Sequence, residues 1–298
     1  MVFIHPGFVK TATSSLQVQV FSNHPDIAYL GMPAKSRDMA WAIRHICHAD
    51  SVYYRNERVK EIFDVSLKSV PAGKTVILSH ENLALYESKD KGMLAQRLHE
   101  LLPDSKVFFT LRRQEEILAS WYLQKLSKYI RGNNFISFDR WLRLKMKARH
   151  RSILDDLDFF RIIDFYAGLF GQENIRIFLF EELRENSSRF AANMSDFLGV
   201  DAARFEGLLK MDRQNPTISR DYIKFWQRWG PWLPYRLAQK LALRMDNSKG
   251  CPAKVEIGGR ARKLVRTLCA ESNRKLEEVY GVPLRSFGYT TGDPGPQE

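Results

Sequence analysis

The chain has 298 residues, of which 44% are hydrophobic and 27% are charged, and its formal net charge is +12 at pH 7. These values are typical of a globular protein that can bury a large core. No stretch approaches the roughly 20 apolar residues that a membrane-spanning helix needs, and residues 1–7 lack the basic segment of a secretory signal. The sequence therefore argues against a transmembrane span, and we predict a cytoplasmic protein.

Strand and helix patterns alternate along the first two thirds of the chain. The predicted strands are short apolar runs: Val2–His5, Asp26–Leu30, Lys74–Leu78, Lys106–Leu111 and Ile175–Phe180. Helical patterns begin near Thr13 and Gln114 and also cover Arg37–His48, Asn56–Val70, Lys89–Leu102, Phe159–Phe170 and Glu181–Leu198. Unbroken apolar strands separated by helices indicate a parallel sheet that is covered on both faces. We therefore predict an α/β fold, with a central parallel sheet flanked by helices, of the kind seen in P-loop NTPases.

The last third of the chain shows only helix and loop patterns, including Arg262–Tyr280. We predict a single domain over residues 1–298, in which residues 200–298 form a mostly helical C-terminal part. The three cysteines, Cys47, Cys251 and Cys269, are far apart and form no C-x-x-C pair. This spacing argues against a disulfide framework or a zinc site, so we expect buried thiols and no metal.

Positive charge gathers in two regions, residues 125–151 and 213–263. The first contains nine Lys or Arg residues and one acidic residue, Asp139. Such a field attracts nucleic acid, lipid headgroups, sulfated glycans or a phosphorylated cofactor. A solvated basic face without a specific ligand is the alternative. Charge alone therefore indicates only an anionic partner.

The first predicted strand leads into a turn rich in small and hydroxyl residues. The turn contains a lysine and five small residues: Lys10, Thr11, Ala12, Thr13, Ser14 and Ser15. Small residues let backbone N–H groups approach an anion, and the start of the following helix adds positive potential. A Walker A loop needs G-x-x-x-x-G-K-[S/T], whereas here the lysine comes early and the hydroxyl residues follow it. The turn predicts a phosphate or sulfate site, and a Ser/Thr-rich helix cap without a ligand is the alternative.

A second candidate anion site follows the strand Lys106–Leu111. This strand delivers Arg112 and Arg113 to the carboxyl edge of the sheet, where ligands bind in such folds. A guanidinium can grip a phosphate with two parallel N–H bonds. Ser120 lies eight residues after Arg112, in the next predicted helix. Salt bridges from the paired arginines to Glu115 or Glu116 are the structural alternative.

The two motifs together resemble those of sulfotransferases that use PAPS (3'-phosphoadenosine 5'-phosphosulfate). The resemblance is specific over residues 3–20 and 105–124, and it implies transfer of a sulfuryl group from PAPS to an acceptor hydroxyl or amine. Lys10 would stabilise the leaving phosphate, Thr13 and Ser14 would hold the 5'-phosphate, and Arg112 and Ser120 would hold the 3'-phosphate. The family usually has Gly at the position of Ala12, and it commonly has Asn or Asp, then Pro, where Arg113 and Gln114 stand.

The resemblance also implies a base at the end of the strand Lys74–Leu78. Related enzymes place a His or a Glu at about this point, and this chain has both His80 and Glu81. We favour Glu81, with His80 as a neighbour or as the base itself. The alternative is that these residues only cap a helix that begins near Asn82.

The C-terminal loop that closes over the 3'-phosphate in cytosolic sulfotransferases has no matching pattern here. Lys249-Gly250 and Gly258-Gly259-Arg260 are possible substitutes, and the helix Arg262–Tyr280, with Ser272-Asn273 inside it, is closer to bacterial and glycan-type enzymes. We expect a small-molecule or glycan acceptor, and no specific nucleic acid. The first basic region, with its interleaved aromatic residues, could line a cleft for such an acceptor: Tyr129, Phe135, Phe138 and Trp141.

Two other functions remain open at this point. A P-loop-like kinase using ATP would need the Gly-Lys-Ser/Thr order and an acidic residue for magnesium at a strand end, where this chain has Arg112. A basic protein that binds nucleic acid or another anion would need neither motif, and its binding would weaken steeply with salt.

Overall fold

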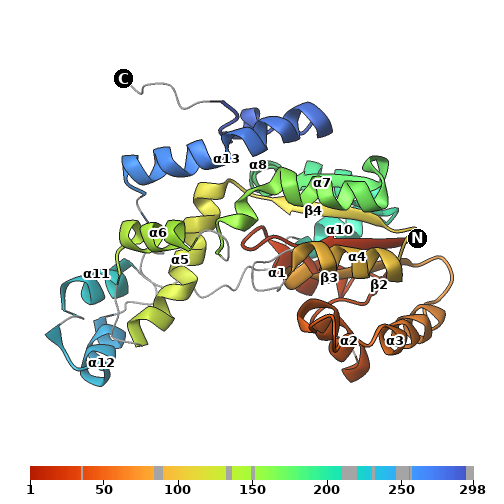
Figure 1. Ribbon diagram of the computed structural model, residues 1–298, viewed down its shortest axis with the longest axis horizontal. Helices are drawn as coiled ribbons and strands as arrows, with labels where there is room; N and C mark the ends of the chain where they lie inside the picture. Colours follow the sequence, from red (N-terminus) through yellow and green to blue (C-terminus); the bar gives the residue numbers. More distant parts are fainter. Residues whose placement is uncertain are drawn as a thin grey trace.

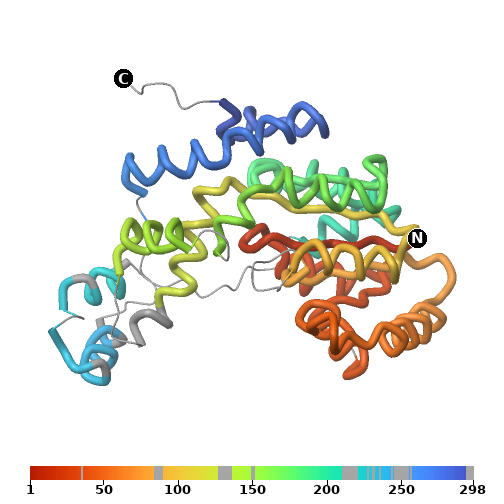
Figure 2. The backbone as a smooth tube through the Cα atoms, in the orientation of Figure 1, coloured from red at the N-terminus to blue at the C-terminus, as the bar shows by residue number. Residues whose placement is uncertain are grey.

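The computed structural model describes residues 1–34, 36–83, 90–131, 136–148, 152–209, 220–229, 232–245, 255 and 257–292, and Figure 2 traces the chain. The described strands form one sheet in the order β2-β3-β1-β4-β5, and all its pairs are parallel. These strands are β1 (Val2–Pro6), β2 (Ile27–Tyr29), β3 (Thr75–His80), β4 (Lys106–Leu111) and β5 (Ile175–Leu179). The predicted central parallel sheet is confirmed.

Helices cover both faces of this sheet (Figure 1). The short helix α1 (Thr13–Ser15) and the π-helix η1 (Leu16–Phe21) follow β1 directly. The later helices of the α/β part are α2 (Arg37–His48), α3 (Asn56–Lys68), α4 (Lys91–Leu101), α5 (Gln114–Arg131), α6 (Phe138–Lys147), α7 (Phe159–Phe170), α8 (Phe180–Glu185) and α9 (Ser187–Leu198). The flanking helices that the sequence predicts are therefore present.

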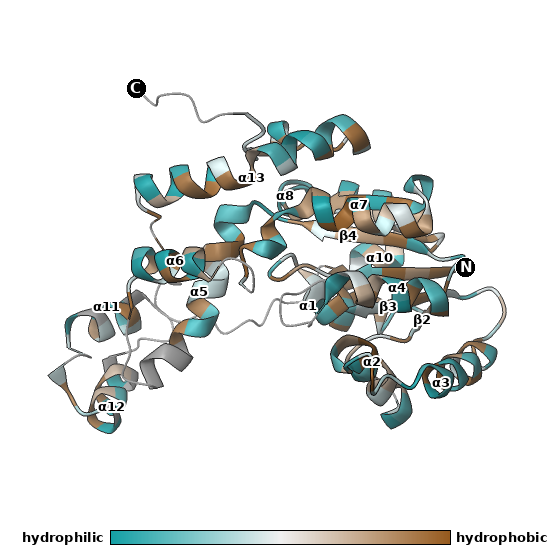
Figure 3. Cartoon of the chain, in the orientation of Figure 1, coloured by the Kyte–Doolittle hydropathy of each residue, from teal (hydrophilic) through white to brown (hydrophobic). Residues whose placement is uncertain are grey.

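The strands carry apolar side chains on both faces because successive residues of a strand point in opposite directions. Phe109 packs into a core with α2, α4, α5 and α7, whereas its neighbour Phe108 packs into a second core with η1, α9 and α10 (Ala202–Leu209). Figure 3 shows hydrophobic residues concentrated along the strands and teal residues on the outer parts of the helices. The continuous apolar runs in the sequence reflect this burial on both sides.

The described part of the chain after residue 200 is mostly helical, as predicted. It consists of α10, α11 (Arg220–Arg228), α12 (Tyr235–Met245) and α13 (Gly259–Tyr280), followed by a 3-10 turn, Arg285–Phe287. The helix α13 returns to the α/β part, where Gln114 and Asn273 exchange side-chain amide hydrogen bonds of 2.6 and 3.3 Å. Within the described ranges, no helix is both long and apolar enough to cross a membrane.

The predicted helix Glu181–Leu198 is wrong in one respect, because it is two helices. The chain leaves α8 at Asn186, whose backbone is extended at φ −146°. The Asn186 side chain then accepts a hydrogen bond of 2.9 Å from the backbone N–H of Arg189 and caps α9. An asparagine inside a helical pattern is a recognised N-cap residue, and this is the physical reason for the break.

Candidate functional site

The turn between β1 and α1 has an unusual backbone. Among the described residues other than glycine, only Lys10 and Ala12 have positive φ, at 63° and 67°. The left-handed conformation costs such residues roughly 1–2 kcal/mol, and strain of this kind gathers at functional sites. Gly7 allows the turn to close, because a Cβ atom there would lie 2.5 Å from Cγ2 of Thr13. The resulting turn, at the start of a helix, suits an anion.

The hydroxyl residues of this turn divide into two groups. Thr11 and Thr13 are buried, and both hydroxyls donate to the carbonyl of Phe8, at 2.8 and 3.2 Å. They therefore fix the shape of the turn. Ser14 is exposed and donates to Oε1 of Glu81 at 3.0 Å, so it lies on the open side with the carboxylate. Ser15, the other predicted ligand, is half-buried.

A chain of buried polar side chains supports the turn from below. His5 on β1 contacts Ser79 on β3 through Nδ1 at 2.8 Å and Thr110 on β4 through Nε2 at 3.1 Å. Gln17 donates to the Ser79 hydroxyl at 2.9 Å, and the Thr110 hydroxyl lies 3.0 Å from that of Thr11. Sequence reasoning missed this network, although the signal was present as one polar residue near the carboxyl end of each neighbouring apolar strand.

The network fits a single arrangement of protons. Since the Thr11 hydroxyl donates to Phe8, it accepts from Thr110, and Thr110 in turn accepts from His5 Nε2–H. His5 Nδ1 then accepts from Ser79, which accepts from Gln17. This arrangement requires a neutral imidazole, and burial lowers the pKa of His5 to about 3. The support of the turn therefore stays uncharged at neutral pH.

Arg112 joins the second motif to the first. Its Nη1 donates to the carbonyl oxygen of Lys10 at 3.1 Å, and its guanidinium lies 4.5 Å from the centre of the Phe180 ring. Its Nε and Nη2 donate to one oxygen of Glu116, at 3.0 and 2.8 Å. These three contacts use three of the five guanidinium N–H groups. No described residue accepts a hydrogen bond from the other two N–H groups.

Glu116 is the common partner of three arginines. It pairs with Arg112, Arg113 and Arg184. Burial raises the pKa of its carboxyl, but the hydrogen bonds and positive charges of Arg112 and Arg113 outweigh this effect, so the pKa is lowered. The salt bridge that the sequence analysis gave as a structural alternative is therefore present at Glu116. It engages only the Nε and Nη2 edge of the Arg112 guanidinium. Glu115 instead pairs with Arg266, at 2.6 Å.

Ser120 lies one helical turn after Glu116 on α5, which places both residues on the same side of the helix. It is half-buried, and its hydroxyl makes no side-chain hydrogen bond with any residue in the described part of the chain. Because Glu116 holds Arg112, this spacing brings Ser120 to the same region. Arg112 and Ser120, which are eight residues apart in the sequence, therefore lie in the same region of the structure.

The end of β3 places His80 and Glu81 beside the turn. Pro6 at the end of β1 is the register partner of His80. His80 Nδ1 accepts a hydrogen bond of 2.8 Å from the backbone N–H of Asn82. Burial, with smaller contributions from His48 and Arg44, lowers the pKa of His80 to about 4. A neutral imidazole whose Nδ1 accepts a bond carries its proton on Nε2, so neither ring nitrogen is free to take a proton. Glu81 has no such restriction.

Lys10 is partly withdrawn from water at this edge. Burial lowers the pKa of Lys10, the negative charge of Glu81 raises it, and the positive charge of Arg112 lowers it further. These couplings mean that Lys10, Glu81 and Arg112 act on one another electrostatically. The structure therefore brings the lysine, the acidic residue and the arginine that the sequence singles out to one edge of the sheet.

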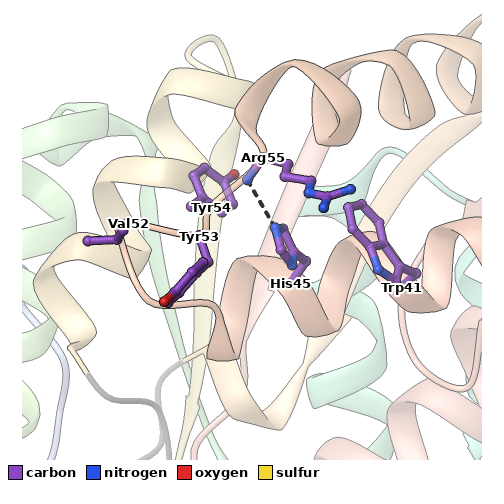
Figure 4. Close-up of a pocket in the computed structure, with 6 residues that line it drawn as sticks. All are labelled: Trp41, His45, Val52, Tyr53, Tyr54 and Arg55. Atoms are coloured by element: carbon purple, nitrogen blue, oxygen red, sulfur yellow. Dashed lines mark hydrogen bonds between the residues drawn. The ribbon is translucent and has the colours of Figure 1, made fainter.

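A separate pocket of about 490 Å³ lies beside α2 and the segment that follows it. Figure 4 shows its six lining residues: Trp41, His45, Val52, Tyr53, Tyr54 and Arg55. The His45 ring lies between Trp41 and Tyr54, with ring centroids 4.4 and 5.5 Å apart and planes within 21°. His48, one turn beyond His45 on α2, contacts Asn82 at 3.2 Å. The face of α2 thus runs from the pocket to the end of β3.

Two of the four aromatic residues that the sequence placed in a cleft are buried instead. Phe138 and Trp141 are buried and pack against Tyr122 at ring-centroid distances of 5.5 and 5.6 Å. The side chain of Tyr129 and all of Phe135 lie outside the described residues, as does Lys249-Gly250. Gly258 caps the start of α13. Cys47 and Cys269 are buried free thiols, and the described residues contain no cluster of three or more metal-binding side chains.

The chain resembles solved sulfotransferase structures. The sulfotransferase from Alicyclobacillus acidocaldarius matches with a TM-score of 0.59 and 17% identity, over 96% of this chain and 97% of that one. The mouse sulfotransferase SULT7A1, solved in complex with PAP, matches with a TM-score of 0.39 and 16% identity, over 72% of this chain and 66% of that one. No protein-family model and no curated protein matches the sequence. The first of these two structures shows which fold the chain has.

Proposed function

We propose that this chain, which has the sulfotransferase fold, transfers a sulfuryl group from PAPS to an acceptor hydroxyl or amine. One observation carries the proposal: Arg112 contacts the carbonyl of Lys10 at 3.1 Å, so two anion-binding elements that are about 100 residues apart in sequence meet at one edge of the sheet. PAPS is a nucleotide with anionic groups on both its 5' and 3' sides, and a site with two such elements suits it.

The residues present fit this donor. The turn with positive φ at Lys10 and Ala12 offers backbone N–H groups to the 5' side, and Arg112 keeps two N–H groups for the 3'-phosphate. Ser120 has a hydroxyl that is not engaged by any described residue. PAPS supplies the sulfuryl group and a phosphate leaving group, and Lys10 provides the positive charge that stabilises the leaving phosphate.

We assign Glu81 as the base that accepts the proton of the acceptor. It lies beside the turn, where Ser14 donates to one of its oxygens, and its other oxygen is left for a substrate. His80 suits a different role, since its Nδ1 already accepts from Asn82. Its Nε2–H can donate a hydrogen bond to a substrate oxygen. Glu81 therefore acts as the base and His80 positions the acceptor.

We propose a carbohydrate as the acceptor. The rings of Trp41, His45 and Tyr54 stack on one another in the pocket beside α2, and Trp41, which is 37% exposed, ends the stack as a platform. Buried Arg97, 3.9 Å from the centre of the Tyr54 ring, closes the other end of this stack. Flat aromatic surfaces bind the apolar faces of sugar rings, and Arg55 at the pocket adds a hydrogen-bond donor. The platform is joined to the catalytic edge through His48 and Asn82.

A comparison of nucleotides tests the donor. In thermal unfolding experiments, PAP should raise the midpoint well beyond the effect of ATP with Mg²⁺ at the same concentration. A kinase would show the opposite order, and equal stabilisation by any polyanion, lost in moderate salt, would indicate general anion binding. A direct assay then follows PAP release from PAPS in the presence of sugar acceptors, and Trp41→Ala should raise KM for the acceptor without changing the affinity for PAP.

A further inference from the structure

The helices α11 and α12 form a hairpin that exposes several large apolar side chains. Trp229 and Trp232 flank the turn of this hairpin and are 48% and 82% exposed, and Leu237 on α12 is 48% exposed. The backbone N–H of Trp232 donates to the carbonyl of Trp229 at 3.1 Å, so the backbones of the two tryptophans lie close together. Exposed apolar groups gathered in this way mark an interaction surface.

The hairpin is nevertheless packed on its inner side. Phe225 and Trp226 of α11 and Ala238 and Ala242 of α12 are buried and belong to the larger hydrophobic core. Other residues of both helices therefore already contribute to the core, and the exposed tryptophans are surface residues. In Figure 1 the hairpin lies at the left end of the molecule, beyond α5 and on the side toward which the strands run.

The charge of the hairpin is almost entirely positive. Residues 220–245 contain one acidic residue, Asp221, and six basic residues: Arg220, Lys224, Arg228, Arg236, Lys240 and Arg244. The last three are spaced four residues apart and form one exposed stripe along α12, and Leu237 stands at its edge. On α11, the Arg228 guanidinium lies 5.5 Å from the Trp229 ring centre. Basic residues and exposed apolar residues are thus neighbours on both helices.

We propose that the α11–α12 hairpin binds an anionic lipid bilayer, with Trp229 and Trp232 at the boundary between headgroups and acyl chains. Tryptophan favours this boundary, and amphipathic helices with basic polar faces lie within it. The basic stripe complements the negative surface potential of anionic lipid. Since the described helices include none that could span a bilayer, the hairpin would hold the protein at the membrane surface.

Other occupants explain the surface less well. A second copy of the chain would place two sets of the same positive charges against each other, which is unfavourable. Nucleic acid would be attracted by the charge, and its bases could stack on indole rings. Binding to nucleic acid would not account for the exposed leucine beside the basic stripe. Both occupants become outcomes of the experiment.

Vesicle flotation with the full chain tests the proposal. The probes are vesicles of phosphatidylcholine alone and of phosphatidylcholine mixed with phosphatidylglycerol, at low and moderate salt. We expect binding to the anionic vesicles only. Trp229→Ala with Trp232→Ala should weaken the binding about tenfold or more, and Arg236→Glu with Lys240→Glu should weaken it by a similar factor or more. Lipid brominated in the acyl chains should quench wild-type tryptophan fluorescence and quench the double tryptophan variant much less.

Two matched variants at a distant surface serve as controls. Tyr53→Ala removes another exposed aromatic residue, and Arg37→Glu with Lys68→Glu reverses two exposed charges on α2 and α3. These variants should bind vesicles like the wild type, and all variants should keep the wild-type circular dichroism. No flotation with anionic vesicles, or equal losses in hairpin and control variants, would overturn the proposal. Tryptophan-dependent dimerisation or tighter binding to single-stranded DNA than to vesicles would overturn it as well.

Discussion

The two halves of the proposed anion-binding edge are built differently. The turn from Gly7 to Ser14 is held by buried hydrogen bonds, and two of its residues have a strained backbone conformation. The Arg112 side is held by ion pairs, since Glu116 binds Arg112 together with Arg113 and Arg184. The first half rests on a neutral network beneath the surface, whereas the second rests on charged side chains that remain partly exposed.

This difference indicates how each half would contribute to binding and to the chemical step. A preformed turn needs no reorganisation when an anion arrives, so its interactions are available to the chemical step. The arginine cluster instead has its charge balanced by Glu116 beforehand, and a phosphate must share that guanidinium. We therefore expect the turn to govern turnover and the arginine side to govern selection of the nucleotide. Four predictions test this division.

The largest effect should come from Lys10. Removing a positioned positive charge that stabilises a leaving group should lower kcat by about 10²–10³-fold, so Lys10→Ala should leave almost no sulfuryl transfer from PAPS. The matched control is Lys106→Ala, a half-buried lysine at the start of β4, on the opposite edge of the sheet. Normal turnover by Lys10→Ala would show that the turn is not the reaction site.

Arg112 should control affinity more than turnover. Losing a hydrogen-bonded charge on a phosphate costs roughly 1.5–3 kcal/mol, so calorimetry should show PAP binding to Arg112→Ala weakened about tenfold or more. Ser120→Ala should weaken it a few-fold. Binding of AMP, which has no 3'-phosphate, should be unchanged in both variants. If AMP binding falls as much as PAP binding, Arg112 does not read the 3'-phosphate. Arg176→Ala, on the exposed side of β5, is the control.

The buried network should make stability depend on pH. Burial lowers the pKa of His5 from 6.5 to about 3, so between these values the unfolded chain binds a proton at this residue and the folded chain does not. His5 therefore contributes a fall of roughly 1.4 kcal/mol in the free energy of unfolding per pH unit as the pH drops through this window. His5→Gln should reduce the slope in urea unfolding measured from pH 7 to pH 5. An unchanged slope would contradict the neutral network.

The smallest effect concerns the strained turn. Glycine adopts positive φ without penalty, so Ala12→Gly should raise the free energy of unfolding by about 1 kcal/mol. The matched control, Ala192→Gly in the exposed middle of α9, should lower it by about 0.5–1 kcal/mol. Urea unfolding measures both. Destabilisation of equal size in the two variants would mean that the turn carries no strain at Ala12.

The sequence predicted the sheet, its parallel direction and the meeting of Lys10 with Arg112, because apolar strand runs and motif spacing are local signals. It did not predict Glu116 as the shared partner of three arginines, because that depends on α8 bringing Arg184 towards α5. It placed Phe138 and Trp141 in a cleft, because the sequence pattern of aromatic residues among lysines is the same whether a helix buries the aromatic side chains or exposes them. The roles of the site residues and the single domain over 1–298 stay predictions, and the core cluster that includes both Ile4 and Tyr289 supports the latter.

The position of β1 has a consequence during synthesis. Among the strands of the sheet, β1 is synthesised earliest, yet it occupies the middle of the sheet, where Val2 pairs in register with Val76 and Ile4 with Val107. Its backbone groups therefore wait unpaired until both neighbouring strands have emerged. At roughly 5–20 residues per second of translation, that delay lasts several seconds, and throughout it an apolar segment is free to associate with other nascent chains. Chaperone binding to the first residues would protect the chain over this interval.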